Sequence, residues 1–446
     1  MIRNREELAK TPAHETALDC IAAGIEATQP TRVMSEALER DGTALTIGDA
    51  TVDLDDYREV VVVGGGKAAA QMANVIEDVL GDRLTDGVVV TNDPQETDRI
   101  AVVEGSHPTP NEAGEEGARR VLSLADDATA ETLVLCLISG GGSALLPAPV
   151  DDVSLAELQS LTDDLLSSGV TIHEINAVRK HLSAIKGGQL AAAAAPATVH
   201  SLVLSDVVGD DPSIIASGPT VPDESTYADA RDVLDRYDIQ PSAAIEERLE
   251  NGDDGERSET PTANDPAFER TELHMLANGF TALAAARSVA EEHGYTPVIL
   301  SSQVEGEARE AAKTHAAIAD EALATENPVS PPAVLLSGGE TTVTLDGDGS
   351  GGPNQEFVLS GALTSTSADV VVASVDTDGK DGASDVAGAI ADRDALDDER
   401  RARAALAAND VYPYLAERGL VVDTGKTGTN VNDLRVLVVG ESDDTR

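Results

Sequence analysis

The feature that most constrains the fold is a short β-branched run that ends in glycines and is followed by a helical segment. The run EVVVVG at 59–64 indicates a strand buried on both faces, because polar and apolar residues do not alternate in it. Glycines break the run, and residues 68–80 then have the composition of a helix. The same order of strand, turn and helix returns several times. Strands that alternate with helices predict an α/β fold with a mostly parallel sheet.

The chain is long enough for two such domains. Its 446 residues exceed what one hydrophobic core usually holds. Residues 251–266 are rich in glycine, proline, threonine and acids, which is typical of a linker or an exposed loop. Strands and helices resume after this segment. We therefore predict an N-terminal lobe over 1–258 and a smaller C-terminal lobe over 268–446, with the active site in the cleft between them.

The charge of the chain is strongly one-sided. Its 81 Asp and Glu residues and 31 Lys and Arg residues give a formal net charge of 31 − 81 = −50. The acids are scattered, whereas an acidic interaction tail would form a block. A compact chain of this charge repels itself in dilute salt, and molar salt shortens the screening length to about 3 Å. The composition therefore indicates a halophile's protein, and the lack of a basic stripe argues against nucleic-acid binding.

Cysteine usage and hydropathy favour a cytoplasmic protein. Cys20 and Cys136 are far apart and lack metal-ligand spacing, so we expect buried free thiols and no disulfide. The N-terminal residues are polar and contain no signal-peptide core. No apolar run approaches the roughly 20 residues that a membrane-spanning helix needs. We therefore expect neither secretion nor a membrane partner.

Glycine-rich turns are the first candidates for ligand binding. A strand that ends in glycine before a helix offers unpaired backbone N–H groups and the positive end of a helix dipole, which together attract anions. Glycines also make ordinary tight turns, but their recurrence here predicts that phosphate or carboxylate groups are bound. The segments are GGGKA at 64–68, SGGGSAL at 139–145, SGGET at 337–341 and GSGGPNQE at 349–356.

Polar side chains beside these turns are candidates for catalysis. Lys67 would neutralise a phosphoryl group in transfer, and a solvated helix-cap lysine is the alternative. Arg179 lies in a small basic island and would grip a carboxylate or phosphate, or pair with acids on a helix surface. Asp206 follows a strand, where it would act as a general base or hold Mg²⁺, or only cap a turn. His107 would donate to a substrate oxygen, or is a loop histidine held by packing.

Two further segments look like ligand loops but lack the spacing. Residues 374–382 suggest a calcium loop, yet Lys380 and Asp381 stand where an EF-hand needs an oxygen ligand and a glycine. Carboxylates in this turn still suit Mg²⁺, with Asp378 and Asp381 as candidates, and an acidic surface turn is the alternative. Residues 419–427 end in Gly-Lys-Thr, but five residues separate the two glycines and a Walker A motif needs four, so we reject that motif.

Together these segments resemble the class II glycerate kinases, the glycerate 2-kinases with a C-terminal MOFRL domain. The resemblance runs from about residue 10 to about residue 440. It implies an ATP- and Mg²⁺-dependent phosphorylation of D-glycerate, usually to 2-phosphoglycerate, by a Rossmann-like N-terminal domain and a smaller α/β C-terminal domain. The motifs that carry it, in the family's order, are GGGKA, GSHPTPN, LISGGGSALLPAP, INAVRKHLSAIKGGQLA, LSDVVGDDPSIIASGPTVPD, LSGGETTV, GGPNQE, DTDGKDG and GTNVNDL.

The resemblance also implies which residues form the active site. The family's functional lysine matches Lys67, and the aspartate of its SDVxGD motif matches Asp206, so these two are the expected catalytic residues. Pro353 stands where the family's GGRNQE motif has an arginine, so either Arg179 or Lys426 replaces that cation or the nucleotide is handled differently. The expected substrate-binding residues are Ser139, Gly140, Gly141, Gly142, Ser143, Arg179 and His107. The expected nucleotide-binding residues are Gly65, Gly66, Gly338, Gly339, Glu340, Asn354, Gln355 and Glu356.

Two rival functions stay open. A hydroxypyruvate reductase that uses NAD(P)H is the first, since members of this family have carried that label. It needs a dinucleotide site, and Ala69 occupies the final glycine position of a GxGxxG fingerprint. The second rival is a non-catalytic module that binds a phosphosugar or nucleotide, which leaves the lysine, arginine and aspartate motifs without a role. The expected partner is a small-molecule substrate, D-glycerate, and assembly into a homodimer is left open.

Overall fold

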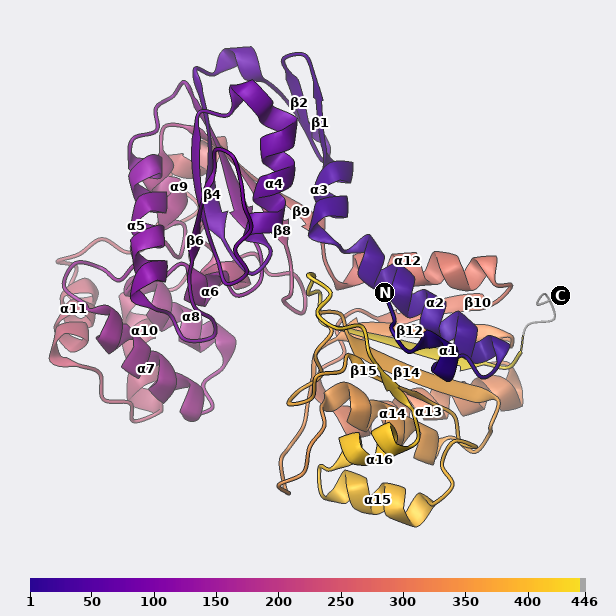
Figure 1. Cartoon of the computed structure of the whole chain (residues 1–446). Helices are drawn as coiled ribbons and strands as arrows, with labels where there is room; N and C mark the ends of the chain where they lie inside the picture. The colour runs from indigo at the N-terminus through magenta and orange to yellow at the C-terminus, as the bar shows by residue number, and fades with distance from the viewer. Residues whose placement is uncertain (442–446) are drawn as a thin grey trace. The chain divides into compact units, whose positions relative to one another are not determined.

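The structure is a computed structural model that describes residues 1–441 (Figure 1). The chain forms two compact units. The central unit comprises Val33–Leu276, and the terminal unit combines Met1–Arg32 with the chain from Ala277 onwards. In the sequence, helix α3 (Pro30–Ala37) crosses the first boundary and strand β9 (Thr271–Ala277) ends at the second. Within the described residues, no helix is both long and apolar enough to cross a membrane.

This division differs from the expected one at both ends of the central unit. Helix α2 (Pro12–Ala27) belongs to the terminal unit, because Ile21 and Ile25 pack in the same core as Leu283. The amphipathic pattern of α2 shows which face is buried but not which partner covers it. The segment 251–266 was expected to link two lobes. It lies inside the central unit instead, because β9 follows it and completes the central sheet.

The central unit is built around a six-stranded sheet with the order β6-β5-β4-β7-β8-β9. The pairs β4–β5, β4–β7, β5–β6 and β7–β8 are parallel, as the strand–turn–helix pattern predicted. A separate antiparallel sheet of three short strands precedes it. The strands of the main sheet are β4 (Glu59–Gly65), β5 (Asp86–Thr91), β6 (Ala101–Glu104), β7 (Thr132–Ile138), β8 (Thr198–Leu204) and β9. The short strands are β1 (Leu38–Asp41), β2 (Ala44–Ile47) and β3 (Ala50–Asp53).

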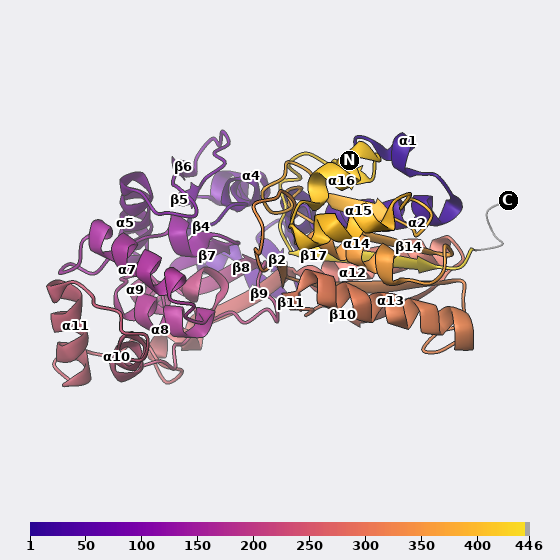
Figure 2. The same cartoon turned by 90° about the horizontal axis from the view of Figure 1, so that it is seen from below.

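Helices cover the central sheet, and four others form a group of their own. Helices α5 and α9 pack on the face that carries Val61 and Val63. Helices α7, α8, α10 and α11 share a separate core, and they lie together in both views (Figure 1, Figure 2). The α-helices here are α4 (Ala69–Leu80), α5 (Glu112–Asp126), α6 (Gly142–Leu145), α7 (Leu155–Ser167), α8 (Ile172–His181), α9 (Gln189–Ala194), α10 (Tyr227–Arg236) and α11 (Ala243–Asp253). The 3-10 turns are η1 (Leu54–Asp56), η2 (Gly81–Arg83), η3 (Ile215–Ser217) and η4 (Pro266–Arg270).

The terminal unit has a mixed sheet with the order β10-β12-β17-β14-β15-β16. Strand β10 runs parallel to β12, and β17 runs antiparallel to both β12 and β14. Strands β11 and β13 form a small parallel pair beside it. The strands are β10 (Thr296–Ser301), β11 (Gly306–Glu307), β12 (Ala333–Gly339), β13 (Thr341–Thr342), β14 (Val370–Asp376), β15 (Gly388–Ala391), β16 (Val421–Val422) and β17 (Asp433–Val439).

The terminal sheet is buried on both faces. Alternate residues of β12 point to opposite sides, so Leu335 packs with α13 and α14, whereas Leu336 packs with α2 and α12. This two-sided burial explains the continuous apolar runs in the sequence. The helices are α1 (Arg5–Leu8), α2, α12 (Gly279–Glu292), α13 (Ala308–Thr325), α14 (Pro353–Thr364), α15 (Glu399–Ala407) and α16 (Val411–Glu417).

Candidate active site

The candidate site lies where the order of the central sheet reverses. From β4 the chain moves to β5 and β6 on one side, and then returns to β7 on the other side of β4. Ligands of open α/β sheets bind outside the carboxyl ends of the strands at such a point. Because Gly65 is paired with Ile138, the GGGKA turn after β4 and the SGGGS turn after β7 lie side by side.

The glycines of the first turn allow the two turns to approach closely. Gly64 and Gly66 have φ values of 137° and 147°, which side chains other than glycine rarely adopt. A Cβ at Gly64 would overlap the Leu137 backbone, and one at Gly66 would overlap Ser139. These glycines therefore serve packing.

The first turn has no free backbone N–H group for an anion. The Gly66 N–H donates to Val90 O at 3.0 Å, and the Lys67 N–H donates to Gly140 O at 2.9 Å. The Ala68 N–H donates to Ser139 Oγ at 3.1 Å. Gly65 belongs to β4 itself. The nucleotide contact expected from Gly65 and Gly66 therefore has no backbone donor at 66–68, and the Lys67 side chain is what this turn offers.

The second turn keeps its donors free. The N–H groups of Gly140, Gly141 and Ser143 have no hydrogen-bond acceptor within residues 1–441, whereas the Gly142 N–H donates to Ser139 O at 3.3 Å. Gly141 has φ 78° and starts helix α6. Successive unpaired N–H groups in such a turn form a concave anion site. The substrate contacts expected at Gly140, Gly141 and Ser143 are therefore sterically and chemically available.

Three side chains from other segments surround the second turn. A Cβ at Gly141 would lie 3.0 Å from His107 Cδ2 and 3.1 Å from Lys67 Cγ. A Cβ at Gly140 would overlap the carboxylate of Asp206. The structure thus brings together Lys67, His107 and Asp206, which are far apart in the sequence.

The electrostatics of this group suit acid–base chemistry. Burial raises the pKa of the Asp206 carboxyl, and the positive charge of Lys67 opposes that shift. Burial lowers the pKa of His107, and Lys67 lowers it further, so the imidazole is neutral at neutral pH. The Lys67 ammonium has no hydrogen-bonded partner in the part of the chain that the structure describes. It is therefore available to a bound anion.

A polar chain extends the site toward α8. The Ser217 hydroxyl donates to Asn176 Oδ1 at 2.9 Å, so the Ser143 hydroxyl, 2.8 Å from Ser217 Oγ, donates to Ser217. Ser217 has φ 62°, an uncommon conformation for serine that often marks functional sites. The buried Asn176 Nδ2 has no hydrogen-bond partner. Sequence reasoning missed Ser217, and the only signal for it was a serine before a glycine in the motif IIASGP.

Arg179 lies one turn after Asn176 on α8. Its half-buried guanidinium has no carboxylate partner within residues 1–441, and burial lowers its pKa. Lys186 is buried nearby and donates to Leu146 O at 3.0 Å. Burial, and then the charge of Arg179, lower the pKa of Lys186 to about 7. Arg179 is therefore a cation without a protein counter-ion, as a ligand-binding role requires.

One metal candidate of the terminal unit, Asp381, has a structural role. The Asp381 carboxylate caps α14: Oδ1 accepts from the Asn354 N–H at 3.0 Å, and Oδ2 accepts from the Gln355 N–H at 2.9 Å. The side-chain amides of both residues also donate to it, at 3.2 and 2.8 Å. Four bonds use the acceptor sites of a carboxylate. Asp381 therefore does not fit as a metal ligand in this arrangement.

The other nucleotide candidates are also placed by the fold. Asn354, Gln355 and Glu356 are at most 1% exposed. Asn354 donates to Asp433 Oδ1 at 2.7 Å, and Glu356 accepts from Asn409 at 2.9 Å. These three side chains are buried in hydrogen bonds within the terminal unit, and the nucleotide contacts expected of them stay a prediction.

The remaining nucleotide and metal candidates of the terminal unit differ in their exposure to solvent. Gly338 and Gly339 are buried in β12, and Glu340 after them is exposed. Asp378 is half-buried and accepts from the Lys380 N–H at 2.7 Å, which leaves part of its carboxylate free. Pro353 occupies the first turn of α14, where its fixed φ favours a helix start.

Comparison with known proteins agrees with the architecture. Residues 16–250 match the family model "Domain of unknown function (DUF4147)", and residues 333–433 match the "MOFRL family" model. A D-glycerate 2-kinase of Thermotoga maritima is 39% identical over 433 residues, which are 95% of this chain and 97% of that protein. A putative hydroxypyruvate reductase of Agrobacterium vitis is 44% identical over 389 residues, which are 85% of this chain and 99% of that protein.

A solved structure has the same fold. The crystal structure of a glycerate kinase from Thermotoga maritima superposes with a TM-score of 0.84 at 38% identity, and the alignment covers 95% of this chain and 99% of that one. The match extends through both units. This chain therefore belongs to the glycerate kinase family that joins a DUF4147 domain to a MOFRL domain.

Proposed function

We propose that this protein is an ATP-dependent glycerate kinase that transfers a phosphoryl group to the 2-hydroxyl of D-glycerate. The observation that carries the proposal is the convergence of Lys67, His107 and Asp206 on the SGGGS turn, whose backbone donors at Gly140 and Gly141 are free. The name of the Thermotoga relative, D-glycerate 2-kinase, supports this reaction, and the name of the solved structure supports phosphorylation of glycerate. The cytoplasm, where ATP is made, is the compartment we propose.

The proposed roles follow from charge and position. Asp206 accepts the proton of the attacking hydroxyl, and its half-buried carboxyl is a stronger base than an exposed aspartate because desolvation raises its pKa. Lys67 stabilises the charge on the phosphoryl group in transfer, which is the main task of an enzyme for this chemistry. The free N–H groups of the SGGGS turn and Arg179 hold the carboxylate of the substrate.

A magnesium ion, which the family implies, would neutralise phosphate charge when bound. Asp378 stays a candidate to hold it, because within residues 1–441 its carboxylate accepts one hydrogen bond, from the Lys380 N–H. Its neighbour Asp376 is a second candidate, because burial and the charge of Asp378 raise the pKa of Asp376 well above its usual range. A cation near these carboxylates would relieve that repulsion. Asp381 is excluded from this proposal because its oxygens cap α14.

A reductase that uses NAD(P)H is the alternative, and the name of the Agrobacterium relative favours it. Against it stands the hydrogen bonding of the first turn. In a dinucleotide fold, the backbone N–H groups after the first strand bind the pyrophosphate. Here the donors of Gly66, Lys67 and Ala68 are bonded to Val90, Gly140 and Ser139. The turn has no free donors for that purpose.

Direct product analysis tests the proposal. The protein is incubated in molar KCl with D-glycerate, ATP and Mg²⁺, and the products are resolved by ³¹P NMR. A 2-phosphoglycerate signal, lost in Lys67→Ala, is the expected result. A 3-phosphoglycerate signal would keep the kinase and correct the attacked hydroxyl. Absence of product, together with NADH oxidation by hydroxypyruvate, would replace the kinase by the reductase.

A further inference from the structure

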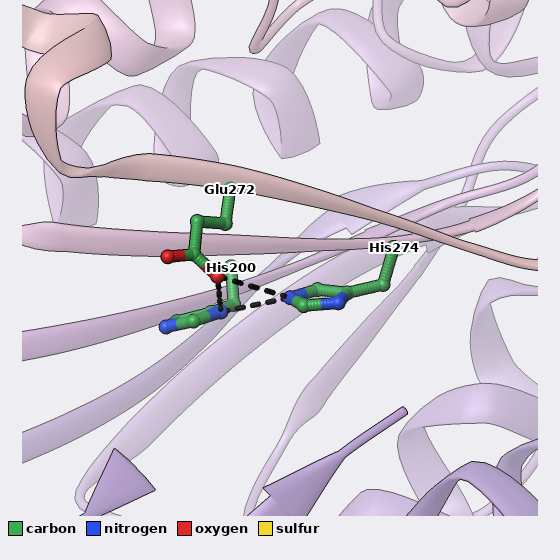
Figure 3. A group of neighbouring side chains, drawn as sticks. All are labelled: His200, Glu272 and His274. Atoms are coloured by element: carbon green, nitrogen blue, oxygen red, sulfur yellow. Dashed lines mark hydrogen bonds and ion pairs between the residues drawn. The ribbon is translucent and has the colours of Figure 1, made fainter. Parts of the chain in front are cut away.

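A second group of chemically active side chains lies away from the residues of the SGGGS turn. His200 belongs to β8, and Glu272 and His274 belong to β9, the neighbouring strand at the edge of the central sheet. Because Glu272 and His274 are two residues apart in a strand, they share one face of it. Figure 3 shows the Glu272 carboxylate and both imidazoles directed toward one another. This group, called here the His–Glu–His cluster, takes no part in the mechanism above.

The cluster combines one hydrogen bond between the two imidazoles with two longer edges to the Glu272 carboxylate. His200 Nδ1 and His274 Nε2 are 2.9 Å apart. Glu272 Oε2 lies 3.8 Å from His200 Nδ1 and 4.0 Å from His274 Nε2, which is too far for hydrogen bonds. Ligands about 2.0–2.1 Å from a tetrahedral zinc ion are about 3.3 Å apart. Shifts of well under 1 Å on each edge would therefore place all three atoms around one ion.

The cluster has a buried side and an exposed side. His200 is 4% exposed. The Glu272 side chain is 63% exposed, which leaves a path for the ion.

The set of donor atoms selects the class of metal. Two imidazoles and one carboxylate suit zinc and its neighbours among the divalent transition metals, whereas magnesium and calcium prefer oxygen ligands. Within residues 1–441 this is the only group of three or more such side chains whose ligand atoms all lie within 4.8 Å of one another.

We propose that His200, Glu272 and His274 bind one divalent transition-metal ion, with Zn²⁺ as the best fit. A solvent molecule or chloride completes the coordination on the exposed side of Glu272. The ion joins the edge strand β9 to β8. Strand β8 ends two residues before Asp206, so the bound metal also stiffens the strand that presents the proposed catalytic base.

Metal binding to purified protein tests the proposal without relying on kinase activity. The metal-free protein is dialysed in molar KCl against a series of Zn²⁺ concentrations, with excess Mg²⁺ present to occupy the acidic surface. We expect saturation at one Zn²⁺ per chain. We expect Glu272→Gln to weaken binding at least about tenfold and His274→Asn to abolish the saturable step. The control is His173→Ala, which removes an exposed histidine of α8 and should bind like the wild type.

A second readout guards against a folding defect in the variants. Cobalt titrated into the wild type should give the visible d–d absorption of Co²⁺ held by nitrogen ligands, and that absorption should be lost in His274→Asn. Glu272 is exposed, so Glu272→Gln should keep the wild-type far-UV circular dichroism. Unsaturable Zn²⁺ uptake by the wild type would overturn the proposal. So would equal Zn²⁺ affinity in the wild type and in a folded His274→Asn variant.

Discussion

A missing Cβ at Gly140 leaves room for the carboxylate of Asp206, and a missing Cβ at Gly141 leaves Lys67 and His107 in contact with the same turn. At the scale of single residues, the site thus depends on where side chains are absent as much as on which ones are present. The free backbone donors lie in the same two residues. A substitution at Gly140 or Gly141 therefore changes both the space around the turn and the position of its backbone donors.

Gly140→Ala should lower kcat strongly. The new methyl group would displace the Asp206 carboxylate, and a displacement of about 1 Å in a catalytic group costs on the order of 100-fold in rate. Gly279→Ala is a matched control, because a Cβ there would lie 3.4 Å from Val431 O, an ordinary contact. Steady-state kinetics on both variants, with circular dichroism to verify folding, makes the comparison. Wild-type kcat in Gly140→Ala would remove Asp206 from the mechanism.

The pH dependence of kcat/KM should report the Asp206–Lys67 pair. Burial raises the pKa of Asp206, so the acidic fall in activity should occur at higher pH than for an exposed aspartate. Lys67 opposes that shift, so Lys67→Met should move the fall to still higher pH, besides lowering kcat by about 10²- to 10³-fold. An acidic limb at the same pH in wild type and Lys67→Met would contradict the pairing.

The stability of Asp206→Asn has a definite sign. The raised pKa means that the folded state holds the proton more tightly than the unfolded state does. The aspartate therefore destabilises the fold increasingly as the pH rises from its unfolded to its folded pKa, and fully above both. Asp206→Asn should have a higher Tm than the wild type at neutral pH and no such advantage at low pH. Differential scanning calorimetry at both pH values checks this.

The sequence predicted those site residues whose role is marked by their immediate neighbours in the chain. Lys67 and Asp206 stood out because each follows a buried strand beside glycines. Ser217 did not, because its role depends on Ser143 and Asn176, which lie far away in the sequence. For Asn354, Gln355 and Glu356 the sequence did not predict burial, because a polar residue that supports the fold and one that binds a nucleotide are the same residue types.

At the scale of elements, helix α14 shows how a structural task can resemble a catalytic one. Its first residues follow Gly352, where a Cβ would overlap Asp381. The Asp381 carboxylate satisfies two N–H groups that a helix start leaves unpaired. The acidic motif DTDGKDG therefore contains a helix cap in its second half. Its first half, with Asp376 and Asp378, is the part free for other work.

The variant Asp381→Asn distinguishes a helix-capping role of Asp381 from a metal-binding role. The amide keeps one acceptor oxygen and places a donor against the N–H groups of α14, so we expect a loss of about 1–3 kcal/mol in the free energy of unfolding. Denaturant titration in molar KCl measures this loss. Asp378→Asn is the control and should cost less, because it does not cap α14. A Mg²⁺ requirement shifted by Asp381→Asn with unchanged stability would restore Asp381 as a metal ligand.

At the scale of the whole molecule, the net charge of −50 sets the conditions under which the fold is stable. We expect the Tm to rise steeply between about 0.1 M and about 1 M KCl, as the screening length falls from about 10 Å to about 3 Å. Sucrose strengthens apolar burial but does not screen charge, so it is the control. If sucrose reproduced the effect of KCl in dilute buffer, charge repulsion would not be the cause.

The sequence predicted the α/β class and the parallel central sheet, because buried parallel strands and their glycine turns are local patterns. It did not predict that the terminal unit is discontinuous. An amphipathic helix such as α2 fits any apolar face, and the choice of α12 and β17 as its neighbours is made by contacts more than 250 residues away.

That discontinuity has a consequence for biosynthesis. Residues 33–276 contain every strand of the central sheet except the last residue of β9, so this unit can fold on the ribosome as soon as it has emerged. Helix α2 is translated first, yet the strands against which it packs, β14 and β17, are among the last to appear. The apolar face of α2 therefore stays uncovered until nearly the whole chain has been translated. Release of a truncated product would leave that face uncovered, a signal by which quality-control proteases could recognise an unfinished copy.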